Sequence, residues 1–479
     1  MQADLKMEVS RVPEELVWAL NLEEGSLHIK GSPGTGKTTL ALELAKALAP
    51  RESVYVSTRL SLEKIYKFYP WIRETIPSSN IIVAAKKLTP DTPKTSDKQP
   101  SEGLAKPDFM EEVYSKIVRG KNKILIVDSI DALKSNTNLP QGDLGLENIL
   151  LEMGEKTGTS VIMVSETESD CQLDSLVDGV VTLRKRFLED RILREILVEK
   201  MRGAEIKHPL YLFTLAGGRF TYFKNSYHSI PPREIKTQIG GVETDTIPTT
   251  IPELDEALNG GLKRSSLNVM ELSQGIGLEH IETLTPFYVS GLSRGIPAIL
   301  VPSRSFSFLD IKTLRKAIME NPALFDNFKK LVHIFQYAKF SIDVSVDKPE
   351  NVHYLEGRDF RDDIDQIRGV AQELLKNTGK KMFFVGISSD VVSYCYGQQN
   401  FFKVLSLWVN QLKLLGAVIG VFYYSQKEQQ VLTQFTDVYL KFDKIDGTLI
   451  LYGKIPKTQI YAITIDYTQK TPTMLTPIQ

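Results

Sequence analysis

Short apolar runs rich in β-branched residues alternate with longer amphipathic segments through the first 200 residues. Four runs have the composition of buried strands: residues 26–30, 53–57, 123–127 and 160–164. The segments between them carry helical spacing, as in residues 38–48. This alternation is typical of βαβ units around a mostly parallel sheet. The pattern predicts an α/β fold, with residues 179–184 and 192–200 as an antiparallel pair at the edge of the sheet.

The same pattern returns in the second half of the chain. Four segments match in order with a slowly growing offset: 12–16 with 251–255, 25–27 with 265–267, 54–59 with 299–304, and 126–131 with 384–389. A duplication with loop insertions accounts for the order and the drift. Ile-Pro-Pro at 230–232 and the glycine pair at 240–241 interrupt regular structure. We therefore predict two tandem domains, residues 1–230 and 231–479.

Residues 86–107 differ from their surroundings, since they hold four prolines and almost no large apolar residue. This composition predicts a mobile insertion in the first domain. Two interpretations remain, a passive insertion and an arm that binds a partner.

The composition changes the picture mainly by exclusion. The chain has 479 residues, of which 42% are hydrophobic and 24% charged, as expected of a folded protein. A formal net charge of -1 provides no global basic field for a nucleic acid or an anionic membrane. Two cysteines provide no disulfide framework, and the start of the chain has no apolar leader. We expect a cytoplasmic protein with no membrane segment.

The strongest chemical signal lies between the first predicted strand and the first long helix. Residues 31–38 fit the phosphate-loop pattern G-x-x-x-x-G-K-[ST] in the context that the pattern requires. Glycines let successive backbone N–H groups point at an anion, and the helix start adds positive potential. We expect ATP to be bound by Gly31, Ser32, Pro33, Gly34, Thr35, Gly36, Lys37, Thr38 and Thr39.

Two acidic residues follow neighbouring predicted strands. Asp128 ends the strand 124–127, where a carboxylate lies beside the phosphate loop, and with the Thr38 hydroxyl it is the predicted Mg²⁺ site. Glu166 follows the strand 161–164. Its position allows it to contact the γ-phosphate or orient water, and it is also compatible with a solvated loop carboxylate.

At this point the sequence resembles the RecA-like ATPases and, within them, the KaiC-like family. The phosphate loop, the Val127-Asp128-Ser129 strand end, the duplication and the segment 247–262, with Leu254-Asp255 and Gly260-Gly261-Leu262, are similar to that family. Within the family, residues 12–15, 29–31 and 57–59 look most like archaeal GvpD-type proteins, which are gas-vesicle regulators. The resemblance implies two tandem RecA-like P-loop domains with mostly parallel sheets flanked by helices.

The resemblance also implies a role for Lys200-Met201-Arg202-Gly203. In KaiC-like rings a K-x-R-G segment reaches the γ-phosphate held by the neighbouring subunit. Lys200 and Arg202 are therefore candidate catalytic cations that act between subunits of a homo-oligomer, such as a ring or hexamer. The alternative is a solvated basic strand.

The sequence departs from the family where the attacking water is activated. KaiC-like enzymes place glutamate after the second strand, whereas this chain has Ser57-Thr58-Arg59. Neither a hydroxyl nor a guanidinium acts as a general base near neutral pH. We expect slow hydrolysis, or a different base such as Glu63 or Glu166. Arg59 is compatible with binding phosphate or the nucleotide of a neighbouring subunit.

The second copy departs further. Its loop reads Glu271 to Glu279, with Leu278 in place of the lysine and Glu279 in place of the Mg²⁺-binding hydroxyl. Gly386 is aligned with Asp128. An apolar residue and a carboxylate in these places oppose phosphate binding. We predict that the second domain binds no nucleotide and serves assembly or partner binding.

Three functions are compatible with these residues. A slow regulatory ATPase with a protein partner, such as a transcription regulator, agrees best with the missing glutamate. A DNA-handling recombinase would need basic or aromatic loops, yet residues 165–170 are acidic and 135–143 hold no cation. The third function is a pseudoenzyme that binds nucleotide only for structure.

Overall fold

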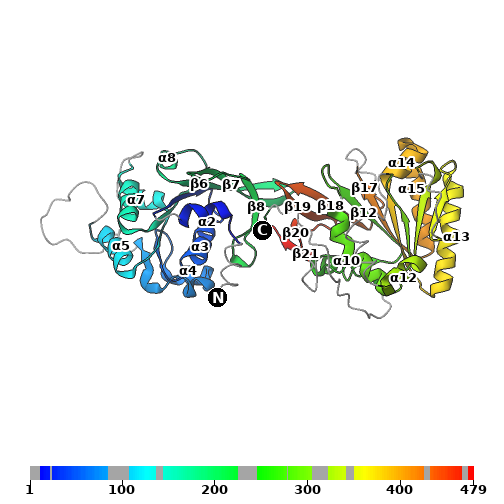
Figure 1. Ribbon diagram of the computed structural model, residues 1–479, viewed down its shortest axis with the longest axis horizontal. Helices are drawn as coiled ribbons and strands as arrows, with labels where there is room; N and C mark the ends of the chain where they lie inside the picture. The colour runs from blue at the N-terminus through cyan, green and yellow to red at the C-terminus, as the bar shows by residue number, and fades with distance from the viewer. Residues whose placement is uncertain are drawn as a thin grey trace. The chain divides into compact units, whose positions relative to one another are not determined.

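A computed structural model describes residues 11–21, 24–84, 107–135, 144–224, 245–277, 279–304, 322–340, 350–424, 432–466 and 473–479. The chain divides into two compact units (Figure 1). Unit 1 comprises Met1–Asn225 with Ile478–Gln479, and unit 2 comprises Ser226–Pro477. The predicted boundary at 230/231 lies outside the described residues. So does the predicted insertion 86–107, except Pro107, which opens a helix.

Unit 1 is built around one sheet whose order is β3-β2-β4-β5-β1-β6-β7-β8-β9 among the described residues. From β3 to β6 neighbouring strands are parallel, and from β6 to β9 they are antiparallel. The predicted β6–β7 pair is confirmed, but its place at the edge was wrong, because β8 and β9 continue the sheet. The strands are β1 (Ser26–Gly31), β2 (Ser53–Ser57), β3 (Ile81–Val83), β4 (Ile124–Asp128), β5 (Ser160–Val164), β6 (Gly179–Leu188), β7 (Arg191–Met201), β8 (Leu210–Thr214) and β9 (Thr221–Tyr222).

Helices cover both faces of this sheet, which explains why β2, β4 and β5 are largely apolar. Along β4, Ile124 and Ile126 pack in the cluster that contains α3, whereas Leu125 and Val127 pack in the cluster that contains α5 and α7. The helices are α2 (Glu14–Asn21), α3 (Lys37–Leu48), α4 (Leu62–Phe68), α5 (Pro107–Gly120), α6 (Ile130–Ser135), α7 (Gly145–Thr157) and α8 (Leu173–Leu176).

Unit 2 has a sheet of the same design, with the order β15-β14-β13-β16-β17-β12-β18-β19-β20-β21 among its described residues. Across the sheet from β15 to β18, neighbouring strands are parallel. From β18 to β21 they are antiparallel. A short β10–β11 pair precedes it. The strands are β10 (Thr246–Ile247), β11 (Leu262–Lys263), β12 (Ser266–Leu272), β13 (Ala298–Val301), β14 (Val332–Tyr337), β15 (Val352–Leu355), β16 (Phe383–Ser388), β17 (Ala417–Tyr423), β18 (Val438–Ile445), β19 (Thr448–Ile455), β20 (Tyr461–Ile465) and β21 (Thr473–Pro477).

Helices again lie on both faces of the unit 2 sheet. α10 packs with one apolar cluster, and α13 and α15 pack with the cluster on the opposite face. The helices are α9 (Pro252–Ala257), α10 (Glu279–Ser293), α12 (Pro322–Leu331), α13 (Phe360–Thr378), α14 (Ser389–Tyr396) and α15 (Phe401–Leu414). Both units therefore have the α/β architecture of tandem RecA-like domains.

Backbone pairing corrects the alignment of the first strand by one residue. In unit 1 the N–H of Ser26 donates to the carboxylate of Asp178, which directly precedes β6, over 3.1 Å. In unit 2 the N–H of Leu267 donates to Asp437, which directly precedes β18, over 2.8 Å. Ser26 is thus equivalent to Leu267, not to Ser266. A shift of one residue exchanges the two faces of a strand, so only this register aligns the side chains correctly.

The same reasoning corrects the partner of Asp128. In unit 1 Asp128 pairs with Val164 of the neighbouring strand. In unit 2 Ser388 pairs with Phe422, the residue equivalent to Val164. Ser388, rather than Gly386, therefore stands where unit 1 has Asp128. The second unit still has no carboxylate at this position.

Candidate functional site

The phosphate loop connects β1 to α3 at the carboxyl end of the parallel strands. Gly34 and Gly36 have φ values of 75° and 109°, in the left-handed region that favours glycine. Gly31 is required for a different reason, because a Cβ there would lie 2.5 Å from the carbonyl oxygen of Leu183. Thr35 closes the loop by donating its hydroxyl to the Ser32 carbonyl over 2.9 Å.

Lys37 opens α3 and turns back over the loop. Its Nζ donates to the carbonyls of Gly31 and Ser32 over 2.6 and 2.9 Å. Burial lowers the pKa of Lys37, and the carboxylates of Glu166 and Asp128 act in the opposite direction. Two predicted site residues that follow β4 and β5 thus act electrostatically on the Lys37 ammonium group.

The predicted metal residues are in contact. Thr38 donates its hydroxyl to Asp128 Oδ2 over 2.6 Å, and Tyr55 donates its hydroxyl to the same oxygen over 3.0 Å. Burial raises the pKa of Asp128, since both described partners are neutral hydroxyl groups. The charges of Lys37 and Arg59 act in the opposite direction on this pKa. A carboxylate beside a threonine hydroxyl fits the oxygen ligand set that Mg²⁺ prefers. The contact of Tyr55 with Asp128 was not predicted, although the sequence shows a tyrosine within an apolar strand.

Glu166 lies two residues beyond β5 and forms a two-pronged ion pair with Arg59, two residues beyond β2. The oxygen–nitrogen distances are 2.6 and 2.9 Å. Because β4 separates β2 from β5, the pair bridges over the strand end that carries Asp128. Glu63, the other carboxylate considered as a base, is exposed in the first turn of α4.

Lys200 and Arg202 lie at the end of β7 and bond within their own chain. Lys200 Nζ donates to the carbonyls of Asp174 and Val177, each over 2.7 Å, around the end of α8. Arg202 pairs with Asp178 over 2.8 Å. The structure places both cations around the α8–β6 connection, and their catalytic action toward a neighbouring subunit stays a prediction.

A buried charge cluster beneath the phosphate loop was not predicted. Lys30, whose side chain is 0% exposed, contacts Asp174 over 2.9 Å and Glu199 over 2.8 Å. His28 contacts the other oxygen of Asp174 over 2.7 Å. Burial alone would raise the pKa of Asp174, but hydrogen bonds from His28, the Cys171 N–H and Lys30 hold it well below its usual value. Polar residues at alternate positions of β1 were the available signal.

Two cations of the β6–β7 pair brace the phosphate loop from outside. Lys185 and Arg194 are opposite each other across the two strands. Lys185 Nζ donates to the Pro33 carbonyl over 3.3 Å, and Arg194 donates to the Gly34 carbonyl over 3.2 Å. These bonds use carbonyl oxygens of the loop and leave its N–H groups to other partners.

In unit 2 the equivalent loop retains glycine, and a side-chain carboxylate of the same chain accepts a hydrogen bond from one of its N–H groups. Gly275 has φ 89°, close to the φ of Gly34. The Gly277 N–H donates to Glu279 Oε2 over 2.6 Å, so a side-chain carboxylate takes an N–H of the loop. Leu278 lies outside the described residues. The loop therefore carries a carboxylate from its own chain where a phosphate loop binds its ligand.

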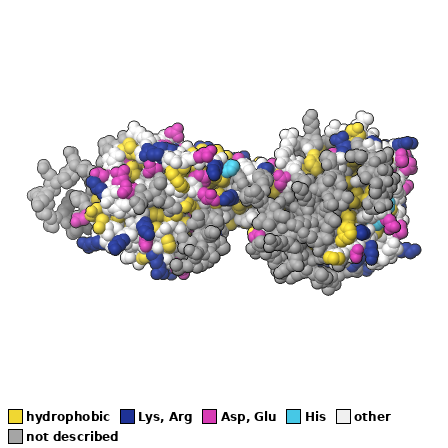
Figure 2. Space-filling model, viewed as in Figure 1, with side chains coloured by type: hydrophobic (Ala, Val, Ile, Leu, Met, Phe, Trp, Pro, Cys, Tyr) yellow, Lys and Arg dark blue, Asp and Glu magenta, His cyan; other side chains and the backbone are white. Residues whose placement is uncertain are grey.

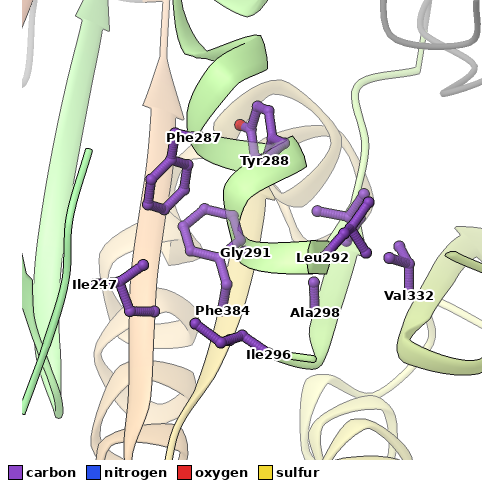
Figure 3. Close-up of a pocket in the computed structure, with 10 residues that line it drawn as sticks. Ile247, Phe287, Tyr288, Gly291, Leu292, Ile296, Ala298, Val332 and Phe384 are labelled. Atoms are coloured by element: carbon purple, nitrogen blue, oxygen red, sulfur yellow. The ribbon is translucent and has the colours of Figure 1, made fainter. Parts of the chain in front are cut away.

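Unit 2 also has an apolar pocket, shown in Figure 3. It lies between α10 and the amino ends of β13, β14 and β16, at the opposite end of the strands from the phosphate-loop equivalent. Among the lining residues, Tyr288 has a polar side chain, and burial raises the pKa of its hydroxyl group. The lining residues are Ile247, Phe287, Tyr288, Gly291, Leu292, Ile296, Ala298, Leu300, Val332 and Phe384.

The fold and the loop define unit 1 as a P-loop ATPase domain of the RecA type. Residues 22–221 match the family model of the KaiC ATPase, which covers most of unit 1. The resemblance to the KaiC-like family is therefore confirmed.

Two curated proteins of Halobacterium salinarum are similar to the chain. Protein GvpD2 is 27% identical over 313 residues, which cover 62% of this chain and 63% of GvpD2. Protein GvpD1 is 27% identical over 299 residues, which cover 59% of this chain and 54% of GvpD1. The matches thus span less than two thirds of either relative, and they confirm the resemblance to GvpD-type proteins.

Proposed function

We propose that unit 1 binds Mg²⁺ and ATP and hydrolyses ATP slowly, as the nucleotide-dependent part of a regulatory protein. The contact between Thr38 and Asp128, directly below a phosphate loop with Lys37 at its helix start, carries this proposal. The loop with its Thr38 hydroxyl and the carboxylate of Asp128 come from two separate segments and meet at the carboxyl ends of the parallel strands. A structural role alone would not require them to meet.

Each residue has a role that follows from its chemistry. The loop N–H groups from Gly34 to Thr39 and the Lys37 ammonium would hold the phosphates. Thr38 and Asp128 would hold Mg²⁺, which neutralises charge on the phosphates when bound. Lys37 then exchanges its two carbonyl contacts in the loop for phosphate oxygens.

Slow hydrolysis follows from the residues around the attacking water. General base catalysis contributes roughly 10²–10⁴-fold, and the family's glutamate after β2 is replaced by Arg59. Glu166, whose charge acts on Lys37, is the candidate for the base, and its pairing with Arg59 limits it. Lys200 and Arg202 would assist from a neighbouring subunit after leaving their contacts within the chain.

Unit 2 serves assembly or partner binding in this proposal. Its loop carries Glu279 on an N–H group, and Ser388 replaces the metal carboxylate. The partners are a second copy of the chain in a homo-oligomer and a protein such as a transcription regulator, by resemblance to GvpD-type proteins.

A nucleic acid is a weak candidate for the partner. On the face shown in Figure 2, the described basic and acidic side chains are interspersed.

Within the described residues, none of the helices combines the length and apolar character needed to cross a bilayer. Both cysteines, Cys171 and Cys395, are free, in agreement with the proposed reducing cytosol.

Calorimetry with Mg²⁺ and a nonhydrolysable ATP analogue tests this function. We expect one site per chain, lost in Lys37→Ala and kept in Glu279→Ala, the matched variant of unit 2. Two sites in the wild type would overturn the inert second unit. Binding that survives in Lys37→Ala would overturn the assignment of unit 1.

A further inference from the structure

The Arg59–Glu166 ion pair joins two strand ends that are otherwise fixed. On the Arg59 side, the Thr58 N–H and hydroxyl both donate to the Asp128 carbonyl over 2.9 Å. On the other side, the Glu166 N–H donates to Asp131 Oδ2 over 2.7 Å. Hydrogen bonds thus hold the backbone next to both residues at the carboxyl ends of β2 and β5. A change of partner for Arg59 or Glu166 therefore involves their side chains alone.

The pair is accessible and therefore easily exchanged. The side chain of Arg59 is 56% exposed and that of Glu166 is 31% exposed. Ion pairs in contact with solvent contribute little to stability, because water and salt compensate their separation. A triphosphate held beside Lys37 offers the guanidinium several negative oxygens in the geometry that arginine binds best.

A backbone contact places the pair at the phosphate end of the site. The N–H of Gly31, the first residue of the phosphate loop, donates to the carbonyl of Thr167, the residue after Glu166, over 2.8 Å. An ATP molecule bound by the loop therefore brings its terminal phosphate toward both members of the pair. It attracts Arg59 and repels Glu166, so both effects favour separation of the pair.

Unit 2 provides a comparison at the equivalent residue. Arg304 follows β13 as Arg59 follows β2, and it pairs with Asp390 over 3.5 Å. Its guanidinium also stacks on the Tyr394 ring at 4.5 Å from the ring centre. The arginine is thus retained at this strand end in both units, and in unit 2 an aromatic ring holds it.

We infer that the Arg59–Glu166 pair is a γ-phosphate-sensing latch: ATP, but not ADP, draws Arg59 from Glu166 and releases the carboxylate toward the site. This inference deepens the proposed function and rests on it. Arg59 acts as a ligand that distinguishes ATP from ADP, in the place where the KaiC-like family has glutamate. Glu166 competes with ATP for Arg59 and so limits ATP affinity.

The latch predicts opposite effects from its two members. In calorimetry with Mg²⁺, Arg59→Gln should weaken binding of the β,γ-imido analogue of ATP about tenfold and leave ADP binding unchanged. Glu166→Gln should strengthen binding of the analogue severalfold and leave ADP binding unchanged. Arg304→Gln is the matched control and should change neither. Unchanged ADP binding also reports that each variant is folded.

The double variant decides whether Glu166 acts through Arg59. If the latch exists, Arg59→Gln/Glu166→Gln binds the analogue as weakly as Arg59→Gln. An equal gain from Glu166→Gln with and without Arg59 means simple removal of negative charge, and overturns the latch. An unchanged ATP-to-ADP affinity ratio in Arg59→Gln also overturns it. Absence of binding of both the analogue and ADP by the wild type instead overturns the proposed function.

Discussion

Each unit has an ion pair at the equivalent point of its own sheet. The positive and negative residues have exchanged strands between the two units. In unit 1 Lys30 of β1 contacts Glu199 of β7 over 2.8 Å. In unit 2 the equivalent residue of β12 is Glu271, which contacts Lys454 of β19 over 3.2 Å. Both β7 and β19 have an irregular register where the pair forms. The architecture thus requires a compensated charge at this point but does not set its sign.

The loops directly above these pairs differ in the opposite way. The backbone is retained, with Gly34 and Gly275 both at positive φ, while the chemistry is not. Lys37 and Thr38 have become Leu278 and Glu279. The comparison teaches that both units keep the charge pair in the sheet. They differ in the loop side chains, which are the ones proposed to bind nucleotide. The following predictions test that separation.

The largest expected effect comes from Lys30→Met. It leaves the partly buried carboxylates of Asp174 and Glu199 without their buried ammonium partner, so unit 1 should lose about 3 kcal/mol of stability. Hydrogen exchange, followed separately in peptides of each unit, measures the loss and should show no change in unit 2. Lys123→Met is the control, because the exposed pair of Lys123 with Glu52 contributes at most about 1 kcal/mol. Equal effects of the two variants would contradict the buried role of Lys30.

A smaller effect is expected from the acid dependence of unit 1. The pKa of Asp174 is held well below its usual value of about 3.9, so its contribution to stability is present above that pH and is lost as pH falls through the lowered value. Asp174→Asn should therefore cost about 2 kcal/mol at pH 7 and progressively less below pH ~3. Urea unfolding at several pH values measures this. A difference between variant and wild type that does not change with pH would show that Asp174 acts through packing.

The smallest effect has the opposite sign. The pKa of Asp128 is raised by burial, so without a cation its charge costs stability once pH exceeds the usual value. Asp128→Asn should raise the Tm of the nucleotide-free protein slightly, on the order of 2 °C. The same variant should lose the additional Tm increase that Mg²⁺ gives in the presence of the ATP analogue. A fall in the nucleotide-free Tm would instead assign a structural role to Asp128.

Much of the architecture could be predicted from local pattern. The four apolar runs became β1, β2, β4 and β5, because strands covered by helices on both faces are mostly apolar. β1 is the exception, with Ser26, His28 and Lys30 at alternate positions. The edge of the sheet could not be predicted in the same way. Residues 210–214 form β8, which pairs with β7 across the connection of residues 202–209, and the run itself does not show that it extends this sheet.

The alignment of the two copies shows a second limit. Ser26 and Ser266 match as letters, yet hydrogen bonds to Asp178 and Asp437 align Ser26 with Leu267. Residue similarity among apolar strands does not distinguish registers that differ by one. Only the partner strand does, because it determines which side chains face the helices.

The sequence by itself determined the phosphate loop, since the order of glycines, Lys37 and Thr38 along eight consecutive residues contains the whole anion-binding geometry. It also determined the loss of that chemistry in the second copy, where the same positions are Leu278 and Glu279. Only the tertiary structure decided that Lys30 meets Asp174 and Glu199, and that Arg59 meets Glu166. Those partners are far apart in the chain, and a charge finds its partner through the order of strands in the sheet, which local pattern does not encode.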